Sequence, residues 1–435
     1  MHKYSIRSKI TALKSLLNNE LDTMRTKNIL GVIDLFMLSL MIVSLPSVEA
    51  PKNIFLVLYL VARILTEFLT FNQKKFHWSH WDSMFLTIVV TALLSTIFAG
   101  MPHLEEWKGY KVLLTAILTG WLLSRARYTK EHYQFLFKLI VLSTLPPLIW
   151  GLYEYLVIHS KESLEIHSVG HVNHSAIYLV IIFGAALGWF LSTLNIKKET
   201  LQKKSQTIMP GMLSLLFFIS LIIGMSRGAF GIGVILGLSL FILLGKNKKN
   251  RLIGIVSIIG ILLLAFFLKT NIVQKQINNS KSNNVLAYRD RVWNVSLEAS
   301  RHSPLLGIGL SNFHFISLDQ IKRSVEDRGE TFDAEKYYFQ GHSHNLYLSA
   351  LVERGILGLI VTFIFMLAWM TSLIKTFRQA KRSSEETFLW AGSFSAWLAT
   401  FGIGLVNTTF HHEHAILACL FLGLYVSYTS AVKEV

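Results

Sequence analysis

The sequence predicts an all-α integral membrane protein with about twelve transmembrane helices and a large polar loop before the tenth. The chain has 435 residues, of which 52% are hydrophobic and only 16% are charged. Soluble domains usually carry about a quarter charged residues. Twelve spans of about 20 residues need about 240 residues, which a chain of this length can supply. Apolar runs also alternate with short basic clusters, as membrane topology requires.

The apolar runs predict where the chain crosses the membrane. They lie near 29–46, 53–71, 82–100, 109–124, 134–158, 173–194, 208–224, 228–244, 252–268, 355–374, 388–406 and 412–430. Pro146 and Pro147 fall inside the fifth run and predict a kink there, which neighbouring helices tolerate in a membrane protein.

The distribution of Lys and Arg predicts the orientation of the spans. Basic residues crowd the N-terminal segment and every even-numbered loop, including 197–204 and 246–251. By contrast, the short odd-numbered loop 101–107 has no basic residue, and 159–171 has only Lys161. Because basic loops stay in the cytoplasm, we expect both termini on that side.

This topology divides the chain into four parts. Residues 1–28 are basic and amphipathic without an apolar core and cleavage site, which predicts a retained cytoplasmic segment near the membrane surface. Spans one to nine occupy 29–268, and 355–435 hold the last three spans and a short cytoplasmic tail. Between them, 269–354 form a polar loop on the outer side, which we expect to contain short helices, because structureless loops this long are uncommon.

Composition excludes some kinds of site. The net charge of +16 is spread over many short loops and not gathered on one domain, so it does not indicate a nucleic-acid binder. The single cysteine, Cys419, lies in an apolar run, which excludes an internal disulfide and a thiolate metal site.

His344 is the first candidate for chemistry. It lies with Asn345 at the end of the long loop, just before the span that begins near Gly355. A histidine at the membrane–water boundary can reach both a lipid-linked head group and an acceptor. As a general base it would contribute roughly 10²–10⁴-fold in rate. The alternative is a structural or helix-capping histidine.

Arg227 lies in the tight outer turn Gly224–Ala229, between small residues that let backbone amides approach an anion. Arginine is the preferred bidentate partner of phosphate. The alternative is an arginine that simply extends to water at the membrane interface.

Arg289 and Arg291 form a second candidate anion site in the long loop, within the segment 288–293. Two arginines there could clamp a diphosphate. Alternatively, Asp290 pairs with one of them, in a surface contact worth little.

Histidines gather toward the predicted outer side. They are His103, His159, His167, His171, His174, His302, His314, His342, His344, His411, His412 and His414. His411 and His414 share a helix face at i, i+3, which raises a metal hypothesis. The spacing matches no specific zinc signature, and a third ligand from elsewhere is needed. The alternative is that polar interface positions on this side simply avoid Lys.

Three short motifs together resemble the bacterial O-antigen ligase and polymerase superfamily of membrane glycosyltransferases. The most specific is His344-Asn345 followed by nine residues and Gly355. Ser226-Arg227-Gly228 resembles the short periplasmic arginine turn of the family. The loop signature is represented by Arg289–Trp293 with the later Pro304–Gly309 and Asn312-Phe313. The predicted spans, termini and long loop agree with the ligase plan.

The resemblance implies a GT-C-type fold and a glycan transfer at the periplasmic face of a bacterial inner membrane. The donor would be a glycan on undecaprenyl diphosphate and the acceptor the lipid A–core oligosaccharide. His344 would be the general base, with inversion at the anomeric centre. Arg227 and Arg289 would hold the diphosphate, and Arg291 could replace or assist Arg289. His342 could share the role of His344, and with Asn345 would contact substrate. The family is thought to need no metal and no nucleotide cofactor.

Other functions remain open from sequence alone. An O-antigen or capsule polymerase would share fold and donor but extend another lipid-linked chain, and a protein O-oligosaccharyltransferase would use a protein acceptor. A transporter or flippase is a different class, which places ionisable groups near the bilayer midplane. Here Arg63, Lys111 and Lys138 lie near the ends of apolar runs, where we expect them to extend to water.

Overall fold

The computed structural model describes residues 29–71, 78–166, 169–194, 201–268, 270–281, 286–381 and 383–433. The predicted cytoplasmic segment 1–28 lies outside these ranges. The described secondary structure is almost entirely helical, which confirms the all-α prediction.

The helices follow one another with short connections. In chain order they are Ile29–Ser44, α2 (Glu49–Phe71), α3 (His80–Ile97), α4 (Glu105–Ser124), α5 (Lys130–Ser143), α6 (Leu145–Tyr153), the π-helix η1 (Glu154–Ile158), α7 (Val172–Leu194), α8 (Leu201–Ile223), α9 (Arg227–Leu244), α10 (Lys248–Phe267), α11 (Asn271–Lys281), α12 (Arg289–Ala299), the 3₁₀ turn η2 (Asn312–Phe315), α13 (Leu318–Glu326), the 3₁₀ turn η3 (Ala334–Lys336), α14 (Leu346–Ala380), α15 (Ser384–Ile403) and α16 (His412–Lys433).

Each predicted apolar run falls on a helix. In the described part of the chain, eight helical segments are long and apolar enough to cross a membrane. They are His80–Ile97, Lys130–Ile158, Val172–Leu194, Gln206–Ile223, Arg227–Leu244, Lys248–Phe267, Leu346–Ala380 and His412–Ala431. The chain is thus a multi-pass membrane protein, and a total of twelve crossings remains a prediction.

The fifth run is interrupted where the prolines predict it. α5 ends at Ser143, and α6 begins at Leu145 with Pro146 in its first turn. A proline is tolerated there because the amide nitrogens of a first turn have no partner within the helix.

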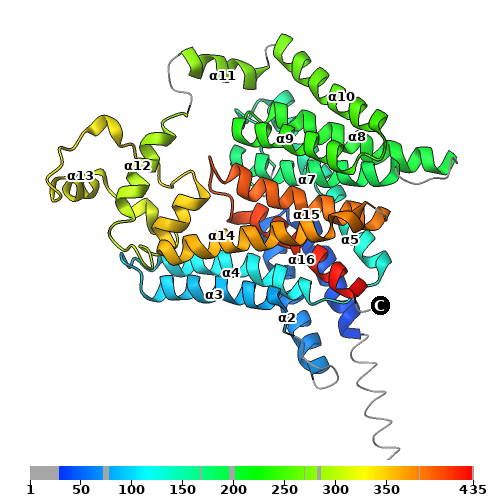
Figure 1. The fold of residues 1–435 in the computed structure, drawn as a ribbon, viewed down its shortest axis with the longest axis horizontal. Coiled ribbons are helices and arrows are strands. Elements are labelled where there is room, and N and C mark those ends of the chain that lie inside the picture. The colour runs from blue at the N-terminus through cyan, green and yellow to red at the C-terminus, as the bar shows by residue number, and fades with distance from the viewer. Residues whose placement is uncertain are drawn as a thin grey trace, which may run out of the picture.

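α7 forms the centre of the bundle. Nearly all of its residues from Ser175 to Thr193 are buried. It packs most extensively against α15 and α8 and also against α9, while α16 packs on α4, and α14 on α15 and α3 (Figure 1). A helix that is apolar on all sides is expected in such a central position.

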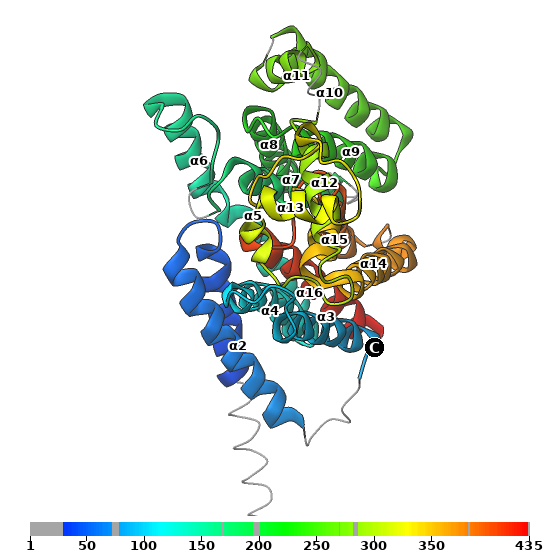
Figure 2. The ribbon, with the colours of Figure 1, turned by 90° about the vertical axis from the view of Figure 1, so that its left-hand side faces the viewer.

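The segment 289–336, here called the loop unit, lies over one end of the bundle. It contains α12, η2, α13 and η3, and Figure 2 shows α12 and α13 in front of the helix ends. The loop unit has its own small core with a residue of α14. The core comprises Val295, Ala299, Ile308, Phe313, Ile316, Ile321 and Val352.

The loop unit is fastened to α14 at a break in that helix. Gly355 has a φ of 66°, and its neighbour Ile356 donates a hydrogen bond to the Pro304 carbonyl at 2.8 Å. A Cβ atom at Gly355 would collide with the Leu305 carbonyl oxygen. Both the backbone conformation and the close approach therefore require glycine. α14 begins at Leu346 and is interrupted at Gly355, the position near which the tenth span is predicted to begin.

The Gly307–Gly309 turn connects this break to the α3–α4 turn. Ile308 donates to the Val352 carbonyl at 2.9 Å, and its own carbonyl accepts from Met101 at 3.2 Å. The Asn312 side chain then donates to the Met101 carbonyl at 2.7 Å and to Glu106 at 3.1 Å. The motif that resembles the family's loop signature thus serves to hold the loop unit in place.

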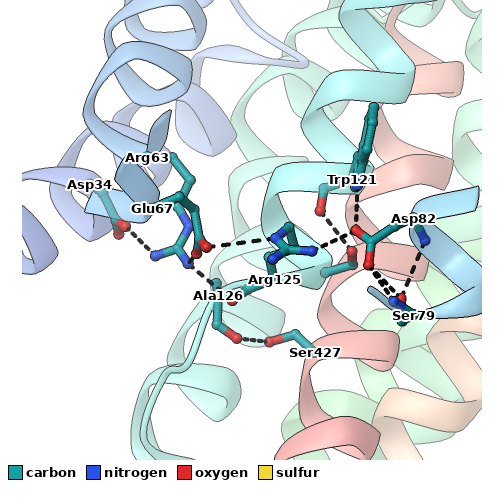
Figure 3. Close-up of polar contacts among 10 residues, drawn as sticks. Asp34, Arg63, Glu67, Ser79, Asp82, Trp121, Arg125, Ala126 and Ser427 are labelled. Carbon is teal, nitrogen blue, oxygen red and sulfur yellow. Dashed lines mark hydrogen bonds and ion pairs between the residues drawn. The ribbon is translucent and has the colours of Figure 1, made fainter. Parts of the chain in front are cut away.

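The opposite ends of α3 and α4 carry a network of paired charges (Figure 3). Arg63 donates to Asp34 at 3.1 Å and also pairs with Glu67. Its side chain is only 7% exposed. The expectation that Arg63 extends to water is therefore wrong, because two carboxylates hold it inside the bundle.

A second arginine continues this network. Arg125 donates to Asp82 at 2.7 Å, and the Trp121 indole donates to the same carboxylate at 2.6 Å. The Arg125 carbonyl accepts a 3.0 Å bond from Arg63, which links the two ion pairs.

Candidate functional site

The candidate site lies under the loop unit, where α7, α9, α14 and α16 begin. Hydrogen bonds connect these helix starts. Ser226, before α9, donates to Asn173 of α7 at 3.0 Å, and the Leu346 amide of α14 donates to the Gly404 carbonyl at 2.7 Å. Residues from distant parts of the sequence therefore share one polar region at this end.

His344 is buried in this region. Its exposed fraction is 9%, and its φ of 48° turns the chain sharply before α14. The Asn407 side chain hydrogen-bonds with the imidazole, whereas the buried Nδ1 atom has no partner among the described residues. A buried nitrogen without a partner needs an explanation. A substrate hydroxyl is one group that could meet it.

The surroundings of His344 keep it neutral. Burial, together with the nearby His342 and Arg289, lowers the pKa of His344 to about 4, although the hydrogen bond with Asn407 opposes the shift. Near neutral pH the imidazole is therefore unprotonated, which is the state that a general base requires.

His342 lies directly beside it. The two ring centroids are 3.9 Å apart. His342 is on the accessible side of the pair, yet the surrounding protein still reduces its hydration. This loss of hydration lowers the pKa of His342, with further contributions from His171 and Arg289.

Arg289 and Arg227 are two cations that lie near each other in the candidate site. Arg289 is the first residue of α12, and burial together with the charge of Arg227 lowers its pKa. Arg227 is the first residue of α9. The Asn279 amide, in the orientation that satisfies both groups, accepts bonds of 3.1 and 3.0 Å from the two terminal nitrogens of Arg227. Two guanidinium groups this close favour an anion between them.

Arg291 is turned to a different neighbour. Its guanidinium lies over the Tyr288 ring, 5.0 Å from the centroid. The sequence left Arg289 and Arg291 as equal candidates, and the structure places Arg289 with Arg227 and the histidine pair.

Asn345 caps α14. Its side-chain oxygen accepts from the amides of Tyr347 at 2.9 Å and Leu348 at 3.0 Å. Its amide nitrogen donates to the Leu405 carbonyl at 2.9 Å. Asparagine is among the best N-cap residues, so the helix itself accounts for this side chain. A substrate contact of Asn345 stays a prediction.

Sequence reasoning missed three neighbours of the site. Asn407 and Asn279 carry no motif, and only the fold brings them to His344 and Arg227. His171 was noted only as one of many outer histidines, yet it lies close enough to affect both His342 and His344.

The expected shared helix face of His411 and His414 is wrong. α16 begins at His412, so His411 precedes the helix. The two rings nevertheless lie 5.0 Å apart, and His174 of α7 lies near both.

A hollow of about 530 Å³ lies elsewhere, on the loop unit between α12 and α13. Arg301, Arg323 and Arg328 contribute to its lining. Arg328 pairs with Glu298 and Glu330, so part of the positive charge is cancelled within the protein.

Comparison with known proteins gives two matches. Residues 212–363 match the family model described as O-Antigen ligase. The chain is also 24% identical over 203 residues to the exopolysaccharide production protein ExoQ of Rhizobium meliloti (strain 1021), covering 46% of this chain and 43% of that protein. The matched family region contains Arg227, Arg289, His342 and His344. These findings confirm the resemblance to the O-antigen ligase and polymerase superfamily.

Proposed function

From its relationship to the O-antigen ligase and polymerase superfamily, we propose that this membrane protein transfers a glycan from undecaprenyl diphosphate to lipid A–core oligosaccharide. The reaction takes place at the periplasmic face of a bacterial inner membrane, with both termini in the cytoplasm and a GT-C-type helix arrangement. The observation that carries the proposal is the position of Arg289, which lies close enough to Arg227 and to the neutral His344 for their charges to interact.

The two arginines bind the diphosphate of the donor. Their mutual repulsion, together with the partial burial of Arg289, makes the empty site electrostatically unfavourable. A diphosphate offers oxygens to both guanidinium groups and relieves this repulsion. The same contacts stabilise the charge that develops on the leaving group.

His344 accepts the proton of the acceptor hydroxyl. The hydroxyl oxygen forms a new bond to the anomeric carbon, while the bond from that carbon to the diphosphate oxygen breaks. Undecaprenyl diphosphate leaves with the electron pair, and attack from the opposite side inverts the anomeric centre. This scheme needs no metal and no nucleotide at the reacting atoms.

Donor binding improves the base. A general base works best when its pKa is near the working pH. Nearby cations contribute to the low pKa of His344, and a bound dianion offsets them. The pKa of His344 therefore rises when the donor occupies the site.

A second candidate is the polymerase reaction, in which the acceptor is another polyprenyl-linked chain. The name of the matched Rhizobium protein, which concerns exopolysaccharide production, favours this candidate. Donor and catalytic residues would be the same.

The test is reconstitution in vesicles with purified lipid-linked glycan and two competing acceptors. Lipid A–core and a second polyprenyl-linked chain are supplied together, and products are separated by mass. Extension of lipid A–core supports the ligase reaction, and extension of the polyprenyl-linked chain replaces it with the polymerase reaction. Extension of neither acceptor, with donor merely crossing the bilayer, favours a flippase.

A further inference from the structure

A second histidine cluster lies beside the candidate site. His174 comes from the first turn of α7, and His411 and His412 come from the start of α16. The His174 ring centroid is 4.9 Å from that of His411 and 4.7 Å from that of His412. One ring nitrogen from each residue lies within 4.8 Å of the other two.

Buried ring nitrogens in this cluster lack hydrogen-bond partners. In the described part of the protein, Nδ1 of His411 has no partner, and the imidazole of His414 interacts only with the Thr409 backbone. His414 is 1% exposed, and its ring lies 5.4 Å from that of His174. Buried polar atoms are normally satisfied, so this group indicates a missing ligand.

We propose that His174, His411 and His412 bind one Zn²⁺ ion. Zinc binds imidazole nitrogen at about 2.0–2.1 Å in a tetrahedral arrangement, which places ligand nitrogens about 3.3 Å apart. The three ring nitrogens, now within 4.8 Å of one another, would move closer together when the ion binds. The fourth position is open to water. Imidazole donors suit zinc and exclude Mg²⁺ and Ca²⁺, which prefer oxygen ligands.

The neighbouring charges are compatible with a cation. Glu413 pairs with Lys52 of α2, so these two charges largely cancel.

The ion connects two helix starts that are far apart in sequence. His412 has a φ of 54°, a left-handed backbone conformation that is uncommon for residues other than glycine. A zinc ion bound to both His412 and His174 would stabilise this conformation of His412. It would also fix the start of α16 against α7. Since the three ligands lie outside the matched region 212–363, this site goes beyond the family resemblance. It does not depend on the proposed transfer.

The experiment measures zinc binding directly. The full chain is purified with an affinity tag that contains no histidine, stripped with a chelator and titrated with Zn²⁺ against a chromophoric chelator. We expect one high-affinity ion per chain and a higher temperature of unfolding with zinc, because a ligand that binds only the folded state stabilises it. Mg²⁺ at the same concentration should do neither.

Variants separate this site from other histidines. His174→Ala and His412→Gln should each weaken zinc binding by at least about 100-fold, since even changes behind the ligands cost 10–100-fold. The exposed His412 can be replaced with little risk to folding. His302→Ala is the matched control, because it removes an exposed histidine of the loop unit, and it should bind zinc normally.

Equal zinc affinity in the native chain and in both ligand variants would overturn the inference, as would the absence of binding at micromolar zinc. His344→Ala distinguishes this inference from the proposed function. It should abolish transfer yet keep zinc binding. A chain that binds zinc but transfers no glycan refutes only the transfer, and one that transfers glycan but binds no zinc refutes only the zinc site.

Discussion

Two groups of arginines at opposite ends of the helix bundle have opposite kinds of neighbour. In the network of Figure 3, Arg63 lies between Asp34 and Glu67, and Arg125 contacts Asp82. Under the loop unit, the charged neighbour that shifts the pKa of Arg289 is another cation, Arg227. The network of Figure 3 cancels its charges within the protein, whereas Arg227 and Arg289 place two charges of the same sign near each other.

This difference indicates that the arginines paired with carboxylates serve stability, and that Arg227 and Arg289 serve function. A buried cation beside a carboxylate recovers much of its lost hydration energy, and removing either partner leaves an uncompensated charge. A cation held beside a second cation recovers that energy only from an external anion. Groups with such perturbed electrostatics are enriched at functional sites. The following predictions test this comparison.

The largest effect is expected at His344. Replacing it with alanine should lower the transfer rate by about 10²–10⁴-fold, because the reaction loses its general base. Transfer in vesicles measures the rate, and membrane insertion is followed by quantitative blotting. His302→Ala serves as control and should keep the native rate. Native activity in His344→Ala would remove this residue from the mechanism.

The next effect concerns stability. Arg63→Ala should lower the free energy of unfolding by about 3–5 kcal/mol, because it leaves buried carboxylates without their cation. Unfolding in detergent at a fixed heating rate measures the change. The control is Lys161→Ala, which breaks a 3.0 Å pair with Glu165 that is exposed to water and worth at most about 1 kcal/mol. Equal shifts in both variants would contradict the larger contribution of the buried ion pair.

Arg289 and Arg291 provide a matched pair for the other end. Arg289→Ala should reduce transfer by about 10²–10³-fold, as removal of one transition-state donor typically does. Arg291→Ala should change it by less than about tenfold, since its guanidinium lies on Tyr288. Unlike Arg63→Ala, the Arg289 variant should unfold no earlier than the native protein, because it relieves repulsion with Arg227. If the two arginine variants lose activity equally, the assignment to Arg289 is wrong.

The smallest effect is a shift in pH dependence. With a pKa of about 4, His344 stays neutral as the pH falls from 7 to 5, so kcat/KM, which reports the free enzyme, should stay flat over that range. The acid limb of kcat should lie at higher pH, since bound donor raises this pKa. Because the folded-state pKa is lowered, the contribution of His344 to stability is complete above about 6.5 and is lost between about 6.5 and 4. An acid limb of kcat/KM at pH 6.5 would contradict the burial of a neutral imidazole.

Local patterns in the sequence predicted the positions of most helices and one interruption between them. Hydrophobic runs predicted the helices, and proline predicted the interruption before α6. The motif from His344 to Gly355 also indicated that a glycine is required at position 355, although it did not give the structural reason. Only the structure shows that Gly355 receives the loop unit, which requires a positive φ and leaves no room for a side chain.

Contacts between distant segments could not be predicted in this way. Nothing near Arg63 in sequence identifies Asp34 as its partner, and the pairing depends on how two helices cross. Likewise, Asn407 reaches His344 only because the connection between α15 and α16 folds back over α14. His174 was needed as the third ligand for a metal, and a single sequence gave no reason to choose it.

The break at Gly355 has a mechanical consequence. The backbone hydrogen bonds from Ile308 to Val352 and from Ile356 to Pro304 join the layer that contains α12 to the first turns of α14. These bonds link the segments that carry Arg289 and His344, while Arg227 stands at the head of a separate helix, α9. A joint tilt of these linked segments would leave the arginine-to-histidine spacing intact and change only their distance to α9. A bulky lipid carrier could enter through that variable gap without disturbing the alignment of the reacting groups.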